Sequence, residues 1–192
     1  MAAASRHKWV PALLLLEVET QARFVAWAAD QLSTDQGLPD SPNAGIRLWF
    51  SVQTILVSAA NITKAMWGGS TENTKRDAQK AERAPLRMAL ALTSTSPLYK
   101  LQVRNDLEHL EATIDHWGLR AQPSASANVR TYTRDPEVAV PRESLGHYNV
   151  ATGDVTFKYR HHSANVPKIV TEAARILPLA SAEARRLLQR GS

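Results

Sequence analysis

Apolar positions in the first 66 residues recur at the spacing of an α-helix. Between Pro11 and Leu32 they return every three or four residues, and a proline suits the first turn because its missing N–H would have no partner there. Residues 35–43 contain glycine and proline and break the pattern. The segment Ala44–Met66 is apolar around most of its circumference and precedes a Gly-Gly pair, which predicts the central helix of a bundle.

The helical pattern continues more weakly over the next fifty residues. Residues 70–80 are polar and predict a loop or a weak helix, whereas 83–92 predict a third helix with a proline in its first turn. A fourth helix is expected over 97–117, and Gly118 ends it. Helices therefore dominate the first 118 residues.

The pattern changes after the fourth helix. Residues 121–145 are rich in Ser, Ala, Pro and Arg and have no helical period, so we expect an irregular loop. Two short runs, Gly146–Val150 and Val155–Tyr159, flank a turn sequence and predict a β-hairpin. A last helix is expected over 166–177, with a further helical turn over 181–189.

These elements predict a mainly α protein. We expect a helical bundle over 1–120, the irregular loop over 121–145, and a β-hairpin plus C-terminal helix over 146–192 that packs on the bundle. A chain of 192 residues is the size of one domain, so the three parts are expected to form one unit.

Composition removes several classes of function. The chain has no cysteine, which excludes disulfide-stapled scaffolds, thiol nucleophiles and cysteine-based metal sites. It also lacks the glycine-rich phosphate loop, the G-x-S-x-G turn and the H-E-x-x-H helix, so nucleotide hydrolases, serine hydrolases and zincins have no support. The net charge of +5 is compatible with an anionic partner such as RNA but does not require one. No cofactor is expected.

The N-terminus resembles a signal peptide only in part. Basic residues precede an apolar run, but Glu17 and Glu19 interrupt it and no small-x-small cleavage site follows. No stretch reaches the roughly 18 apolar residues that a membrane helix needs. We therefore expect a cytoplasmic protein with no membrane partner.

The residues that could carry chemistry lie on the predicted fourth helix. Arg104, Asn105, Glu108 and His109 project from the side opposite its apolar face, and both Arg104–Glu108 and Asn105–His109 are four residues apart, close enough to pair. Arginine can bind a phosphate through two hydrogen bonds, and histidine can transfer a proton near neutral pH. RNA supplies its own nucleophile, the 2′-hydroxyl, so such a set needs no metal. The same residue types are also common on an ordinary solvated helix face.

The run Arg104-Asn105-x-x-x-His109 resembles the R-[N/D/H]-x-x-x-H signature of HEPN domains, an α-helical family found in many prokaryotic ribonucleases, toxins and antiphage defence proteins. The similarity extends to Asp115-His116-Trp117, to the second predicted helix, and to the hairpin and closing helix. It covers roughly residues 10–118 and 146–178. The six-residue motif alone recurs by chance, and its position on the fourth helix of a bundle makes the resemblance more specific.

The resemblance implies a bundle of four or five helices that forms a homodimer, with the motif helices of both protomers building one composite site. Active members are metal-independent endoribonucleases that leave 2′,3′-cyclic phosphate ends. By this analogy Arg104 would stabilise the scissile phosphate, His109 would transfer the proton and Asn105 would orient the site, with Glu108 and His116 in support. A toxin or defence effector of this kind would have an antitoxin protein as partner. The alternative is a non-catalytic helical module that binds a partner protein, a nucleotide or RNA.

Several residues outside the motif could have either a functional or a structural role. The pair His161-His162 does not predict a metal site, because adjacent residues on an extended segment point to opposite sides and no acidic residue lies at ligand spacing. Arginines and a lysine around the hairpin could guide RNA or could simply be solvated: Arg120, Arg130, Arg134, Arg142, Lys158 and Arg160. Three tryptophans, Trp27, Trp49 and Trp117, are expected in the core, and Asn61 is expected to need a buried partner.

Overall fold

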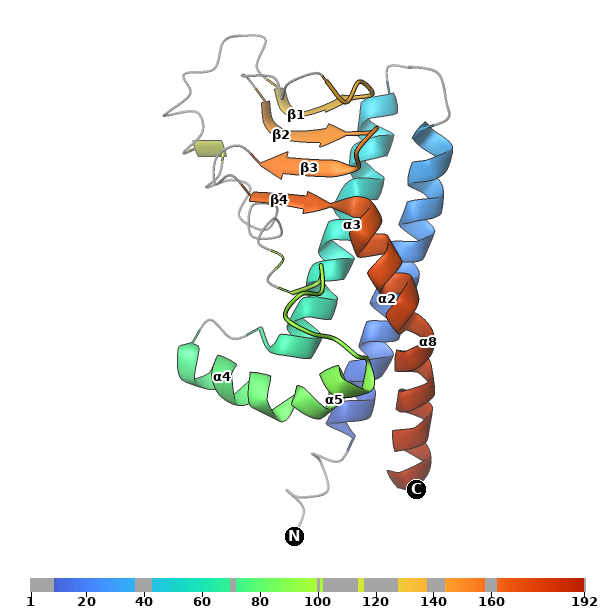
Figure 1. Cartoon of the computed structure of the whole chain (residues 1–192), viewed down its shortest axis with the longest axis vertical. Coiled ribbons are helices and arrows are strands. Elements are labelled where there is room, and N and C mark those ends of the chain that lie inside the picture. Colours follow the sequence, from blue (N-terminus) through green and yellow to red (C-terminus); the bar gives the residue numbers. More distant parts are fainter. Residues whose placement is uncertain are drawn as a thin grey trace.

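The computed structural model describes residues 9–36, 43–69, 72–99, 101, 114–115, 128–137, 144–157 and 162–191. Over these residues the fold is mainly helical, with a small four-stranded sheet and a closing C-terminal helix (Figure 1). The helices are α2 (Val10–Gln36), α3 (Ala44–Trp67), α4 (Asn73–Glu82), α5 (Ala84–Ala89) and α8 (Val166–Gly191). The strands are β1 (Asn128–Thr133), β2 (Ser144–Asn149), β3 (Asp154–Phe157) and β4 (His162–Asn165).

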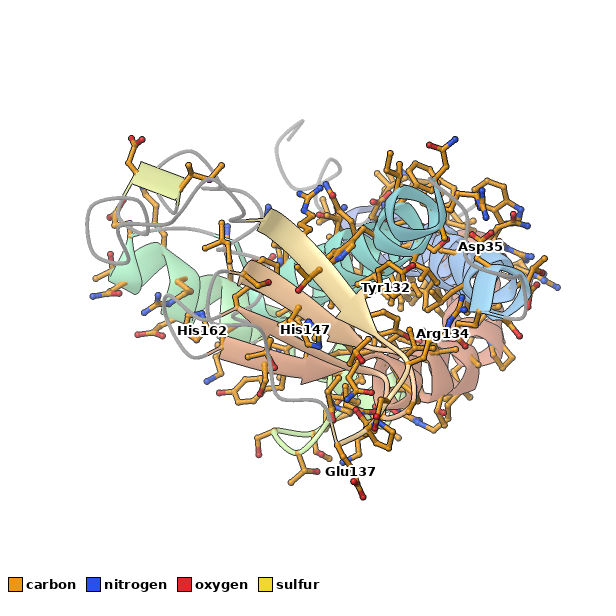
Figure 2. The ribbon with its side chains drawn as sticks, turned by 90° about the horizontal axis from the view of Figure 1, so that it is seen from above. Asp35, Tyr132, Arg134, Glu137, His147 and His162 are labelled. Atoms are coloured by element: carbon orange, nitrogen blue, oxygen red, sulfur yellow. The ribbon has the colours of Figure 1, made fainter. Side chains whose placement is uncertain are left out.

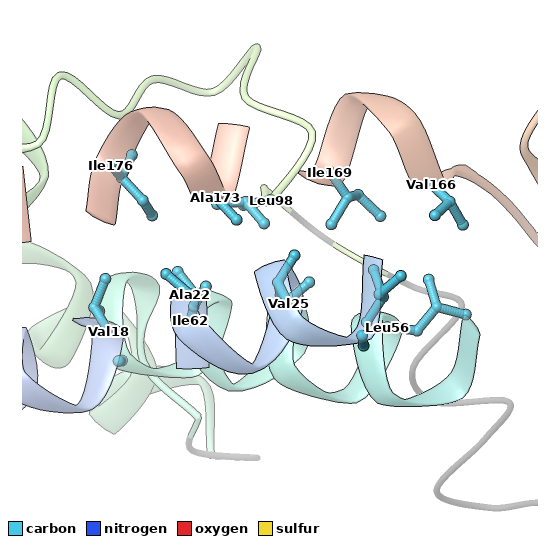
Figure 3. Close-up of a cluster of buried hydrophobic side chains, with 14 of the residues drawn as sticks. Val18, Ala22, Val25, Leu56, Ile62, Leu98, Val166, Ile169, Ala173 and Ile176 are labelled. Atoms are coloured by element: carbon cyan, nitrogen blue, oxygen red, sulfur yellow. The ribbon is translucent and has the colours of Figure 1, made fainter. Parts of the chain in front are cut away.

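The core lies where α8 packs across the antiparallel pair α2 and α3. Apolar side chains from the three helices meet in one layer (Figure 3), and most of them are fully buried: Val18, Val25, Leu56, Ile62, Ile169, Ala173 and Ile176. Polar contacts fix the register of α2 on α3. Asn61 Nδ2 donates to Gln21 Oε1 at 3.4 Å, and Arg47 Nε donates to Asp35 Oδ1 at 2.9 Å. The partner expected for Asn61 is therefore present, in a part-buried contact.

Two arginines hold the C-terminal end of α3. Gly68 follows the helix with a φ of +91°, a conformation that glycine adopts at little cost. Arg87 Nη1 donates to the Met66 carbonyl at 2.6 Å, and Arg83 donates to the Lys64 carbonyl, which also accepts from the Gly68 N–H at 3.0 Å. Cations suit this end of the helix dipole. Burial lowers the pKa of both guanidinium groups below the ordinary value of arginine.

Helix α4 extends away from the bundle and has no buried residue (Figure 1). The sequence predicts a loop or a weak helix over 70–80, and the structure shows a helix from Asn73 to Glu82. The third helix was predicted over 83–92, and the structure shows the shorter helix α5, which ends at Ala89. The fourth helix does not begin at Pro97, since 97–99 form a turn. After Leu101, the described residues of that segment are Ile114 and Asp115, both helical.

The sheet has the strand order β1-β2-β3-β4. β2 and β3 form the predicted antiparallel hairpin, with Tyr148 opposite Val155. β1 pairs with β2 in parallel, and β4 pairs antiparallel with β3. The irregular loop predicted over 121–145 is therefore wrong for Asn128–Thr133 and for Ser144 and Leu145, which begin β2. Ten residues separate β1 from its parallel partner β2, and no local sequence pattern indicates a parallel pairing.

The last helix is continuous where two pieces were predicted. Pro178 lies inside α8, although a proline in a helix interior costs about 3 kcal/mol and removes one hydrogen bond. Ile176, Ala180 and Ala184 are spaced four apart along the helix and all are fully buried. Burial of this apolar stripe on both sides of Pro178 offsets the cost and keeps the helix in one piece.

Trp49 joins the sheet to α3. Its indole N–H donates to the Thr131 carbonyl at 3.0 Å, and its ring meets Phe157 edge-on at 6.2 Å between centroids. The expectation of a core position is confirmed for Trp49, which is 4% exposed, and wrong for Trp27, which is 59% exposed. Trp117 lies outside the described residues. Among the helices the structure describes, none combines the length and the apolar character needed to cross a bilayer.

Candidate functional site

The residues predicted to carry catalysis fall outside the part of the chain that the structure describes. Arg104, Asn105, Glu108 and His109 belong to residues 102–113, and His116 belongs to 116–127. The geometry of the motif, its pairing and its approach to a second protomer therefore stay predictions. The structure does describe the segments that lead into the motif and out of it.

The segment before the motif is held firmly to the core. Leu98 is fully buried, and its carbonyl accepts a hydrogen bond from the hydroxyl of Thr63 on α3. Ser96 Oγ donates to Glu172 Oε1 on α8 at 2.8 Å, and Leu101 packs against the core. Hydrogen bonds to α8 and α3 thus hold the chain at Ser96 and Leu98, and Leu101, three residues before Arg104, packs against the core.

An ion pair on α8 strengthens this attachment. Arg175 Nε donates to Glu172 Oε2 at 2.7 Å, and Arg175 Nη1 donates to the Leu90 carbonyl at 3.0 Å. The hydrogen bond from Arg175 is the main reason why the pKa of Glu172 lies below its ordinary value of 4.5, and the bond from Ser96 adds to it. Glu172 is therefore ionised at neutral pH and links the 90–98 turn to α8.

The segment after the motif enters the sheet, whose two faces differ. Tyr132, Tyr148 and Val155 lie in one cross-strand row that faces the helices, and Tyr132 lies where the sheet meets them (Figure 2). The neighbouring row on the opposite face is polar and takes one residue from each strand: Thr131, His147, Thr156 and Ser163. We call these four residues the polar row.

Hydrogen bonds in the polar row fix the ring protons of His147. Ser144 Oγ donates to the Gly146 carbonyl at 2.7 Å and so can only accept from Thr131 Oγ1, which lies 2.7 Å away. Thr131 has then used its own proton, and its oxygen accepts from His147 Nδ1 at 2.8 Å. This chain of donors assigns a proton to Nδ1. No sequence motif singles out His147, because its position opposite Thr131 depends on the parallel pairing of β1 with β2.

Burial decides what His147 can do. The residue is 2% exposed, so a substrate in solution does not reach its ring in this structure. A buried histidine with a defined hydrogen bond on Nδ1 stabilises the sheet and orders β1 against β2. We assign His147 a structural role, and Figure 2 shows it on the sheet away from α2 and α3.

Of the adjacent histidines after the hairpin, His162 lies on β4 and is half-buried. His161 is outside the described residues. No group of three or more His, Asp or Glu side chains that could hold a metal occurs within the described ranges.

Of the arginines expected to guide RNA, the structure describes Arg130 and Arg134. Arg130 lies over the ring of Trp49, with its guanidinium carbon 5.7 Å from the ring centroid, and burial lowers the pKa of Arg130. Arg134 Nε is buried. These positions favour structural use of Arg130, and the remaining basic residues of the set lie outside the described residues: Arg120, Arg142, Lys158 and Arg160.

A shallow pocket lies near the C-terminal end of α3. Its volume is about 440 Å³, and its lining includes the cationic side chains of Lys64 and Arg83 and the amides of Asn61 and Gln79. Arg83 already binds the Lys64 carbonyl, which limits what its guanidinium can offer to a ligand. The carboxylate of Glu17 also lines the pocket, and it already accepts a hydrogen bond from Gln21 Nε2 at 2.8 Å.

Helices α2 and α3 carry several exposed apolar side chains. Exposed large apolar side chains share one side of each helix: Leu13, Phe24 and Trp27 on α2, and Ile46, Phe50 and Val57 on α3. We call these six residues the outer face. The second helix is buried over much of its circumference, though not on this side, and it contacts α2, α8, α4, α5 and β1, as expected of a central helix.

Comparison with known proteins adds no relative. No family model, no curated protein and no solved structure matches the chain. The HEPN resemblance therefore rests on the motif and its sequence context.

Proposed function

We propose that the chain is a HEPN-like, metal-independent endoribonuclease of the toxin or defence type, acting as a homodimer. The observation that supports the proposal is the Arg104-Asn105-x-x-x-His109 motif in a mainly helical chain. The firm attachment of Leu98 to α3 and of Ser96 to α8 is consistent with a motif segment that needs a rigid support.

The chemistry follows from the residue types. His109 would take the proton of the substrate 2′-hydroxyl, whose oxygen attacks the adjacent phosphorus. Arg104 would stabilise the charge that develops on the phosphate, and Asn105 would orient the site. The bond from phosphorus to the 5′-oxygen breaks, and that oxygen takes up a proton, which a second histidine in the composite site would supply. The products are a 2′,3′-cyclic phosphate and a 5′-hydroxyl.

The test is cleavage of a mixed RNA pool by the purified full chain in EDTA. His109→Ala and Arg104→Ala are expected to reduce cleavage at least 100-fold, because each removes a group needed in the transition state. His162→Gln on β4 and Arg76→Ala on the exposed α4 are the matched controls and should cleave as the wild type does. Cleavage that survives both motif substitutions would contradict the assignment.

A second candidate is a non-catalytic module for association, and the observation that favours it is the outer face. Trp27 and Phe50 are 59% and 62% exposed, which is unusual for aromatic side chains on the two longest helices of the N-terminal half. Absence of RNA cleavage together with association through this face would favour the module.

A further inference from the structure

Cations and aromatic rings gather where α4 and α5 lie against the C-terminal end of α3 (Figure 1). Lys80 on α4, Arg83 at the junction and Arg87 on α5 follow one another at intervals of three and four residues. The Arg87 N–H donates to the Arg83 carbonyl at 3.1 Å, so the helical spacing continues across the junction and the three cations share one side. Trp67 ends α3 and Tyr99 lies in the turn before the motif, with ring centroids 5.4 Å apart. We call these five residues the basic cluster.

Aromatic rings and carbonyls hold the cations of the basic cluster in place. Lys80 Nζ lies 6.0 Å from the centroid of the Tyr99 ring, and Arg87 Cζ lies 5.9 Å from that of the Trp67 ring. The face of an aromatic ring attracts a cation. Arg87 Nη2 also donates to the Lys80 carbonyl at 2.7 Å, which ties the two cationic residues together. Because Lys80 is exposed, the cluster presents a positioned cation at the surface.

The positive charges of the basic cluster have no carboxylate partner. Lys75, on the same helix as Lys80, pairs with Glu72 at 2.7 Å. Within the described ranges, no carboxylate forms an ion pair with Lys80, Arg83 or Arg87. Burial lowers the pKa of Arg87, and the neighbouring Arg83 cation lowers it further, which shows that the two charges repel each other. A group of like charges without counter-ions favours an anionic ligand.

The basic cluster lies close to the motif along the chain. Tyr99 precedes Arg104 by five residues, and five residues span at most about 18 Å. Leu98, next to Tyr99, is fully buried and its carbonyl accepts from a hydroxyl on α3, so the chain at Tyr99 is attached to the core. An RNA strand that reaches the motif is therefore within reach of Lys80, and its phosphates are anions at regular spacing.

We propose that the basic cluster binds the phosphate backbone of the RNA that flanks the cleaved bond. Lys80 is the phosphate contact, Tyr99 is the positioning residue that holds its ammonium group, and the arginines add positive potential while they hold the end of α3. The choice of RNA rests on the proposed function. Because Lys80 contacts a phosphate outside the reacting bond, it contributes to the affinity for the substrate and not to the chemical step.

The test is binding of a fluorescein-labelled, mixed-sequence RNA to the full chain carrying His109→Ala, which leaves the RNA intact. Fluorescence anisotropy gives the affinity between about 50 and about 300 mM salt. Lys80→Gln in this background is expected to weaken binding about tenfold at low salt and to lower the slope of log affinity against log salt by about 0.7, the share of one phosphate contact. Lys75→Gln is the matched control, because it removes the same charge from another side of α4, and it should bind as the parent does.

The role of the Tyr99 ring is tested by a double-mutant cycle in the same assay. Tyr99→Phe keeps the ring and should bind as the parent does, whereas Tyr99→Leu should weaken binding several-fold. Tyr99→Leu should have no further effect once Lys80→Gln is present, because the ring acts through the ammonium group. Equal losses from Tyr99→Leu in both backgrounds would contradict this positioning role, since a general loss of folding does not depend on Lys80.

Cleavage kinetics with His109 intact give a second readout. Lys80→Gln is expected to raise KM about fivefold and to leave kcat within about twofold, because the contact lies away from the reacting atoms. A lower kcat at unchanged KM would overturn the proposal.

The remaining outcomes separate this proposal from the proposed function. A chain that does not cleave RNA but whose RNA binding is weakened by Lys80→Gln and not by Lys75→Gln would contradict the ribonuclease and support the basic cluster. Equal affinities and salt slopes for these two variants, or no RNA binding by the parent, would overturn the basic cluster as an RNA site even where the motif variants abolish cleavage. A loss on Lys80→Gln that is confined to binding of polyglutamate would assign the cluster to an acidic protein segment and would overturn the proposal as well.

Discussion

The turn between β2 and β3, which meets the first residues of α8, offers a sharp test of the fold. Gly153 has a φ of +71°, and a Cβ atom at this position would lie 2.3 Å from Pro167 Cδ and 2.6 Å from Pro167 Cγ. The Gly153 carbonyl also accepts from the Val166 N–H at 2.9 Å, so the turn holds the first residue of α8. Gly153→Ala therefore disturbs the junction between the sheet and the closing helix.

Two costs add in this variant. A non-glycine residue in the left-handed region costs roughly 1–2 kcal/mol. Overlap with a proline ring, which cannot rotate away, costs about 1–3 kcal/mol by analogy with overpacked cores. The expected loss is about 2–5 kcal/mol, or a fall in Tm of about 5–15 °C for a chain of this size.

Thermal unfolding followed by circular dichroism measures the loss. Gly69→Ala is the matched control, because its Cβ would meet only the flexible side chain of Lys64, at 3.3 Å, and the expected change is within about 0.5 kcal/mol. Pro167→Ala introduced into Gly153→Ala should recover the part of the loss that comes from overlap. A fall in Tm below about 2 °C for Gly153→Ala would refute the reasoning.

Two further predictions concern pH. Burial raises the pKa of Tyr148 from 10.0 to about 12, so the protein should lose about 2–3 kcal/mol of stability as pH rises from 10 to 12. Urea unfolding of Tyr148→Phe should show a smaller loss over the same pH range. An equal loss of stability in the variant and the wild type would refute the assignment. Arg175 and Ser96 lower the pKa of Glu172, so its stabilising effect is present above pH 4.5 and is lost as pH falls through the lowered value. Glu172→Gln should therefore be less stable than the wild type at pH 7, and the difference should shrink as pH falls below 4.5 in the same assay. A difference that stays constant down to the lowest pH at which the wild type remains folded would contradict the ionic contribution.

Local periodicity was sufficient for the helices that bury one face. The segment Ala44–Met66 was predicted within one residue of α3, because its apolar spacing and the following glycine pair both act locally. Which side of the helix is covered is a different question. The sequence placed Trp27 in the core, yet its exposure depends on where α8 and the sheet pack, and no local pattern contains that information.

The sheet was predicted only where its strands are neighbours in sequence. β2 and β3 were found as a hairpin because a turn joins them directly. β1 has the β-branched and aromatic residues of a strand in Val129, Thr131 and Tyr132, a signal that the surrounding Ser, Ala and Pro residues concealed. β4, with the sequence His-Ser-Ala-Asn, has little strand propensity, and its pairing with β3 defines it.

The candidate catalytic residues depend on sequence alone. Spacing on a helix brings Arg104, Asn105 and His109 to one side, but a composite site requires two chains, and one sequence does not specify how they meet. The polar row shows the reverse case: Thr131 and His147 are sixteen residues apart, and only the parallel register brings them together.

The most direct test of the central claim removes the substrate's own nucleophile, the 2′-hydroxyl. An RNA oligonucleotide that the chain cleaves in EDTA is compared with the same sequence carrying a single 2′-deoxy nucleotide immediately 5′ of the cleaved bond, and the products are analysed by mass spectrometry. The proposed mechanism predicts a 2′,3′-cyclic phosphate from the RNA and no cleavage at the substituted position. Cleavage of the 2′-deoxy substrate at the same bond would contradict attack by the 2′-hydroxyl, and with it the role given to Arg104 and His109.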